Sequence, residues 1–141
     1  MTTGYLGSIS GSHYRSLIQN LELPVMLHTD DDHVVDVNRA FADFLGFTLP
    51  EARRLDPREL VHPAQQPEYD HDQSLLVSGS TLSLTADYDL IRKNGAAVRV
   101  RVKKSVARHN AETVVMTIVE TGARVNTELA HPISIARIPA G

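Results

Sequence analysis

The sequence contains no cysteine and no tryptophan among its 141 residues. Without cysteine the chain cannot form disulfide bonds, thiolate zinc sites, iron–sulfur clusters, a cysteine nucleophile or a cysteinyl cofactor adduct. The best apolar stretch, residues 114–119, is far too short to span a bilayer. The first five residues lack the basic and apolar regions of a signal peptide. These absences predict a soluble, cytoplasmic chain with no membrane partner.

The remaining composition is that of an ordinary globular protein. Apolar residues make up 42% of the chain and charged residues 22%, and the mass of 15.5 kDa corresponds to one domain. We expect a flexible, glycine-rich leader over residues 1–11 and a domain over residues 12–121. Residues 122–141 are expected to form an extended tail, because Pro132 and Pro139 disfavour helix in the residues before them.

The first half of the domain predicts a helix, a hairpin and three short helices. Residues 12–23 form the expected N-terminal helix, which ends before Pro24. Residues 25–29 and 33–37 predict two strands around an acidic turn. Asn38 is the expected N-cap of a helix over residues 39–45, and Thr48 and Glu51 have the spacing of a capping box. Asp56-Pro57 predicts a further one-turn helix.

The second half predicts one longer helix followed by three strands. The helix covers residues 66–77, and alternating apolar and polar residues predict strands over 82–90, 98–103 and 113–120. Lys93-Asn94-Gly95 predicts a hairpin turn with positive φ at both Asn94 and Gly95. Strands at both ends of a helical middle predict an α+β fold, with a mostly antiparallel sheet covered on one face.

Four segments occur in the order and spacing of a known family. They are Val37-Asn38-Arg39-Ala40-Phe41 before a short helix, Leu45-Gly46-Phe47-Thr48, Pro50-Glu51-Ala52 with a one-turn helix ending at Val61-His62-Pro63, and the Arg92–Gly95 hairpin. Together they resemble a PAS domain over residues 14–121. The resemblance implies a five-stranded antiparallel sheet that cups a pocket against small helices. It also implies a sensory or interaction module that binds haem, flavin, a small metabolite or nothing, and signals through dimer contacts.

We expect a small, largely apolar ligand in this pocket. Three polar side chains of its wall, those of His28, His71 and Tyr88, would orient a polar group of the ligand. The expected pocket wall consists of Met26, His28, Phe41, Phe44, His71, Leu75, Tyr88, Leu90, Val100, Met116 and Ile118.

The sequence does not identify a cofactor. Haem-binding PAS domains place their iron ligand on the helix that contains His71, so His71 is the candidate haem ligand; the alternative is a half-exposed histidine paired with Asp70 or Asp72. Non-covalent flavin stays open but less favoured, since the three phenylalanines fall near one helix. The cysteinyl flavin adduct is excluded. No metal site is expected, because the cluster of His28, Asp30–Asp32 and His33 lacks the spacing of a ligand loop.

We expect a protein without enzymatic activity. The sequence has no G-x-S-x-G elbow or other nucleophile signature. Two alternatives to a ligand sensor remain open at this point: a small enzyme built on the same pocket, and a ligand-free interaction module.

The net charge of −3 is unevenly distributed, with −9 over residues 1–91 and +6 over residues 92–141. The basic run is Arg92, Lys93, Arg99, Arg101, Lys103, Lys104 and Arg108. It predicts either a solvated outer sheet face or a surface that pairs with the acidic half of a second copy. Interleaved aromatic residues for base stacking are missing, so we expect no nucleic-acid partner.

The apolar stripe of the N-terminal helix has two interpretations. It covers the domain's own sheet, or it packs against another subunit. We favour a homodimer, with a downstream signalling protein as a further partner. The predicted dimer interface is Tyr14, Leu17, Ile18 and Leu21.

Overall fold

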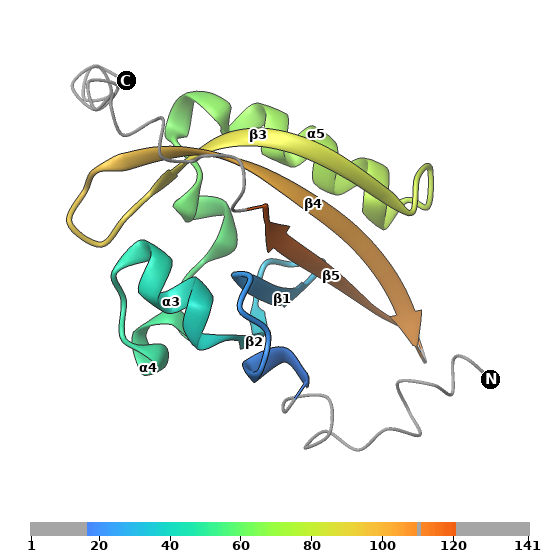
Figure 1. The fold of residues 1–141 in the computed structure, drawn as a ribbon. Helices are drawn as coiled ribbons and strands as arrows, with labels where there is room; N and C mark the ends of the chain where they lie inside the picture. The colour runs from blue at the N-terminus through green and yellow to red at the C-terminus, as the bar shows by residue number, and fades with distance from the viewer. Residues whose placement is uncertain (1–16, 110, 121–141) are drawn as a thin grey trace.

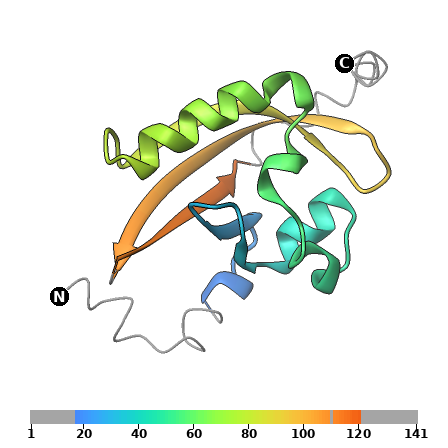
Figure 2. The same cartoon turned by 180° about the vertical axis from the view of Figure 1, so that it is seen from behind.

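A computed structural model describes residues 17–109 and 111–120 as a curved five-stranded antiparallel sheet with helices packed on its concave face (Figures 1 and 2). The strand order is β2-β1-β5-β4-β3. The strands are β1 (Val25–Thr29), β2 (Val34–Val37), β3 (Ser83–Ile91), β4 (Ala97–His109) and β5 (Glu112–Val119). The helices are α3 (Arg39–Leu45), α4 (Leu49–Ala52), η1 (Pro57–Leu60), η2 (Pro63–Gln65) and α5 (Gln66–Val77). The predicted α+β architecture is confirmed, and the leader and tail lie outside the described residues.

The predicted helix boundaries follow from their caps. Asn38 accepts a hydrogen bond from the Phe41 amide at 2.9 Å, and Gly46 ends α3 with a φ of 86°. The Thr48 hydroxyl and the Glu51 carboxylate form the predicted reciprocal capping box. The longer helix spans residues 66–77 as predicted.

The β3–β4 turn differs from the prediction. Gly95 has a φ of 91°, whereas Asn94 is not among the non-glycine residues with positive φ in the described part of the chain. The Gly95 amide donates to the Arg92 carbonyl at 2.8 Å, and the Asn94 side chain accepts from the Ala96 amide at 2.9 Å. The turn therefore needs only one left-handed residue, the pattern of a longer hairpin loop with a bulge, because Asn94 stabilises it through its side chain.

The N-terminal helix ends earlier than predicted. Of residues 17–24, only 17–19 are helical, and the chain then runs without helix to Pro24. The Asn38 amide group donates to the Ile18 and Leu23 carbonyls at 3.0 and 2.9 Å, which holds this segment against β1. Of the predicted dimer residues, Ile18 is buried, Leu17 and Leu21 are exposed, and Tyr14 lies outside the described residues.

The sheet separates two apolar clusters. The larger cluster lies on the concave side and includes Phe41, Leu45 and Val100, packed beneath the helices. The smaller one lies on the convex side, where Ile18 covers Val25 and Leu27 of β1. A cavity within the larger cluster is the site described below.

Ion pairs on the outer face of β3 and β4 neutralise part of the positive charge of the basic run. Arg99 binds Asp89 at 2.6 Å and Arg101 binds Asp87 at 2.8 Å, each directly across the strand pair. Acidic residues of the first part of the chain are thus neighbours of the basic run, as favourable cross-strand pairs. Lys104 is an exception to the predicted basic outer face, because its side chain is 1% exposed and points inward.

Candidate ligand-binding site

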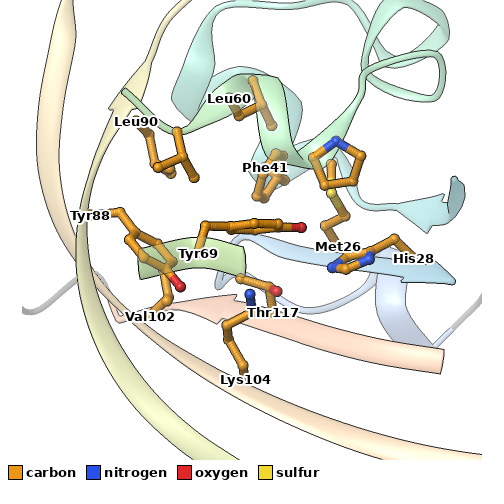
Figure 3. Close-up of a pocket in the computed structure, with 12 residues that line it drawn as sticks. Met26, His28, Phe41, Leu60, Tyr69, Tyr88, Leu90, Val102, Lys104 and Thr117 are labelled. Carbon is orange, nitrogen blue, oxygen red and sulfur yellow. The ribbon is translucent and has the colours of Figure 1, made fainter. Parts of the chain in front are cut away.

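A cavity of about 30 Å³ lies between the concave face of the sheet and the segment from η1 to α5 (Figure 3). That volume accommodates about two water molecules. Most of the wall is apolar, formed by Met26, Phe41, Pro57, Leu60, Val61, Leu90 and Val102. The polar members of the wall are His28, Tyr69, Tyr88, Lys104 and Thr117.

Lys104 is the most unusual group of the wall. Its ammonium group lies 4.1 Å from the centre of the Tyr69 ring and 5.6 Å from that of the Tyr88 ring, so it contacts aromatic faces (Figure 3). Nζ has no hydrogen-bond partner among the described residues. Burial lowers the pKa of Lys104 to about 8, since the charged form loses its hydration.

The two tyrosines link α5 and the sheet to carboxylates near the cavity. Tyr69 of α5 donates to Asp32 in the β1–β2 turn, and Tyr88 of β3 donates to Asp72 of α5, both at 2.7 Å. Burial and these hydrogen bonds raise the pKa of both hydroxyls above the ordinary tyrosine value. Both tyrosines therefore remain neutral donors at physiological pH.

His28 is the third buried titratable residue of the wall and is 1% exposed. Its Nδ1 lies 2.9 Å from the Thr29 carbonyl, which only accepts, so Nδ1 carries the proton and Nε2 is left as an acceptor. Burial lowers the pKa of His28. The imidazole is accordingly neutral near pH 7.

Five of the eleven predicted pocket residues lie together around the cavity: Met26, His28, Phe41, Tyr88 and Leu90. The structure brings them together from β1, α3 and β3. Val100 is buried in the same core without reaching the cavity.

The structure places the other five predicted residues elsewhere. Met116 and Ile118 lie on the convex face with the Ile18 cluster, because strand alternation turns Thr117 inward between them. Phe44 lies beneath the Arg92 guanidinium group, 5.5 Å from it. His71 is exposed and Leu75 half-buried, and neither lines the cavity.

The phase of α5 explains why His71 lies outside. Tyr69, Gln73 and Leu76 are its buried residues, and their spacing of four and three places them on one face. His71 and Leu75 project from another side of the helix. This phase was visible in the sequence, since Tyr69 and Leu76 are two helical turns apart.

Sequence reasoning also missed Tyr69, Lys104, Thr117 and Val102. Two-residue alternation along β4 puts Lys104 on the same face as Val98, Val100 and Val102. The sequence pattern therefore predicts a buried Lys104 side chain. The basic character of the neighbouring residues obscured it. Pro57, Leu60 and Val61 were missed because packing of the irregular segment around η1 has no periodic signal.

The site does not fit a haem or a flavin as it stands. A cavity of about 30 Å³ is roughly tenfold smaller than pockets for drug-sized ligands. The candidate iron ligand His71 is exposed and outside the cavity wall.

Within residues 17–109 and 111–120, no three histidine or carboxylate side chains are arranged to hold a metal ion. Over that same part of the chain, no helix combines the length and apolar character needed to cross a membrane.

Short helices packed around an internal cavity on a five-stranded antiparallel sheet define a distinct class of α+β domain. Residues 12–79 match the family model described as PAS domain. Over these residues the sequence matches the PAS domain family, and the five-stranded sheet with its short helices has the fold of solved PAS domains. No curated protein matches it in sequence.

Solved PAS domains share the fold. A PAS domain from a two-component sensor histidine kinase has a TM-score of 0.66 at 10% identity, over 81% of this chain and 97% of that one. A domain of a sensory box sensor histidine kinase/response regulator from Geobacter sulfurreducens has a TM-score of 0.63 at 18% identity, covering 82% and 96%. Drosophila melanogaster Cycle PAS-B with bound ethylene glycol has a TM-score of 0.63 at 10% identity, covering 69% and 97%. At these identities the similarity shows that the fold is shared.

Proposed function

We propose that this chain is a sensory module that binds a small, largely apolar ligand in the cavity beneath α5 and signals through dimer or partner contacts. The observation that carries the proposal is the cavity, with its mostly apolar wall and a small number of polar groups. The Cycle PAS-B structure, which holds ethylene glycol, gives support by analogy of fold. A binding role without catalysis is part of the proposal.

The cavity wall supplies a route for the signal. Tyr69 contributes its ring to the wall, and its hydroxyl group connects α5 to the β1–β2 turn through Asp32. A ligand larger than the cavity displaces this ring and weakens that connection. The ligand shifts the position of α5 only to the extent that it binds the displaced state more tightly.

The convex sheet face is the proposed contact surface. Val114, Met116 and Ile118 of β5 are only partly buried there, and Leu17, Leu21 and Leu23 are exposed. Apolar groups of this kind favour burial against a second copy. Sedimentation equilibrium measures the result: we expect a dimer, which Leu21→Glu weakens, and a monomer at every concentration contradicts this part of the proposal.

Ligand binding is testable with 1-butanol as a small apolar probe and methyl-labelled protein. We expect saturable NMR shifts at the Met26, Leu60 and Leu90 methyl groups, which line the cavity. Val102→Leu adds a methylene group to the wall and is expected to weaken binding at least threefold. Val98→Leu is the matched control, since Val98 is equally buried on β4 but does not line the cavity.

The result that would contradict ligand binding is judged against an exposed reference residue. The Leu82 side chain is 69% exposed and reports non-specific contact with the alcohol. Shifts no larger at the cavity methyl groups than at Leu82, or equal binding by the two valine variants, would contradict ligand binding in this cavity.

A further inference from the structure

We propose that the ligand is a small organic carboxylate, whose anionic group binds the Lys104 ammonium while its hydrocarbon part contacts the apolar wall. This inference rests on the proposed function and adds the chemical class of the ligand. It starts from a buried cation that has no acceptor and lies at the wall of the cavity (Figure 3).

No oxygen atom of the described residues accepts a hydrogen bond from the Lys104 ammonium group. Its side chain is 1% exposed, so water does not hydrate the ammonium group freely. Asp32 and Asp72 accept from the hydroxyl groups of Tyr69 and Tyr88, and neither accepts a hydrogen bond from Nζ. The aromatic faces offset part of the cost of burying the charge, but they satisfy no hydrogen bond.

A carboxylate is the ligand group that matches this environment. Charge-assisted hydrogen bonds from an ammonium group to a carboxylate are stronger than those to a neutral carbonyl, and low polarity strengthens them further. No other lysine or arginine lines the cavity in the described part of the chain. A ligand with a single negative charge therefore matches the single ammonium group. The apolar majority of the wall suits a hydrocarbon tail.

The size of the cavity limits the ligand to a short chain. A volume of about 30 Å³ holds about two water molecules, and a chain of four carbons therefore requires movement of a wall residue. Tyr69 is the suitable one, because its ring lies between α5 and Lys104 and is anchored at its hydroxyl group by one hydrogen bond. A ligand of about six heavy atoms is expected to bind with a Kd of about 0.1–1 mM.

The titratable groups that surround Lys104 define the pH dependence. They are His28 of β1, Asp32 of the β1–β2 turn, Tyr69 and Asp72 of α5, and Tyr88 of β3; Asp56, before η1, acts on His28 and Tyr69. The pKa of His28 is lowered and those of both tyrosines are raised, so these three stay neutral between pH 7 and 9. Lys104, with its pKa of about 8, loses its proton in this interval. Carboxylate affinity is therefore expected to fall about tenfold between pH 7 and pH 9.

The test compares butyrate with butyramide, a neutral molecule of similar size, using the cavity methyl signals. At pH 7 we expect butyrate to bind at least tenfold more tightly than butyramide. Lys104→Met should abolish this preference while keeping the cavity. Lys103→Met is the matched control, because Lys103 is exposed on the opposite face of the same strand and should leave both affinities and the pH dependence unchanged.

The other outcomes separate failure of the carboxylate inference from failure of the proposed function. Equal affinities for butyrate and butyramide, or a preference that survives Lys104→Met, overturns the carboxylate inference while binding of 1-butanol still supports the proposed function. If neither butyrate nor 1-butanol shifts the cavity methyl signals, both proposals fail. A butyrate affinity that does not decline at pH 9 overturns the role of the ammonium group.

Discussion

Replacing Asn38 with alanine is expected to lower the free energy of unfolding by about 3–5 kcal/mol. Asn38 is fully buried and connects three segments of the chain. Its Oδ1 accepts from the Val25 amide at 3.0 Å and from the Phe41 amide at 2.9 Å. Its Nδ2 donates to the Ile18 and Leu23 carbonyls. Alanine removes the side-chain partner of all four backbone groups; the Phe41 amide keeps the carbonyl of residue 38 and the Ile18 carbonyl keeps the Leu21 amide, whereas the Val25 amide and the Leu23 carbonyl lose the hydrogen bond that Asn38 supplies.

The size of the effect separates this role from ordinary helix capping. Thr48→Ala removes the N-cap of α4, where the capping hydrogen bonds are exposed, and is expected to cost about 1 kcal/mol. Urea unfolding of the two variants and the wild-type protein makes the comparison. If Asn38→Ala costs no more than Thr48→Ala, the hydrogen bonds to β1 and to the N-terminal segment contribute little stability.

Replacing Lys104 with methionine is expected to have the opposite sign and to stabilise the protein by about 1–3 kcal/mol at pH 7. The ammonium group is buried without an acceptor, and methionine keeps most of the side-chain volume. The cation–π contacts with Tyr69 and Tyr88 reduce the gain without cancelling it. Lys103→Met, on the exposed face, is expected to change stability by less than about 0.5 kcal/mol.

The pH dependence supports the same interpretation. Folding lowers the pKa of Lys104 from 10.5 to about 8, so between these values the unfolded chain binds a proton that the folded chain does not. The contribution of Lys104 therefore destabilises the fold fully below pH 8 and diminishes as the pH rises toward 10.5. The advantage of Lys104→Met over the wild-type protein should shrink over the same interval. An advantage that is constant with pH would show that the charge is not its cause.

Much of the fold was predictable because local signals coincide with it. The caps at Asn38 and Thr48 and the glycine after α3 fix helix ends through nearby backbone groups, so the sequence predicts them well. The end of the N-terminal helix depends on Asn38, about twenty residues away, and no local pattern indicates that contact. The form of the β3–β4 turn depends on whether Asn94 uses its backbone or its side chain.

The site was predictable only in part, because its composition depends on phase and on packing. The inner face of β4 follows from alternation, and strict use of that rule places Lys104 inside. Met116 and Ile118 were assigned to the cavity because they are apolar, but the sheet is apolar on both faces at β5. The pairing of Tyr69 with Asp32 joins residues 37 positions apart, and only the folded chain shows it.

A crystal structure of the protein with butyrate tests the central claim most directly. It is expected to show the carboxylate in the cavity beneath α5, with an oxygen about 2.8 Å from Lys104 Nζ and the Tyr69 ring displaced. Butyrate bound only outside the cavity, with Nζ still over the Tyr69 ring, would contradict the assignment of this cavity as a carboxylate-binding sensor site.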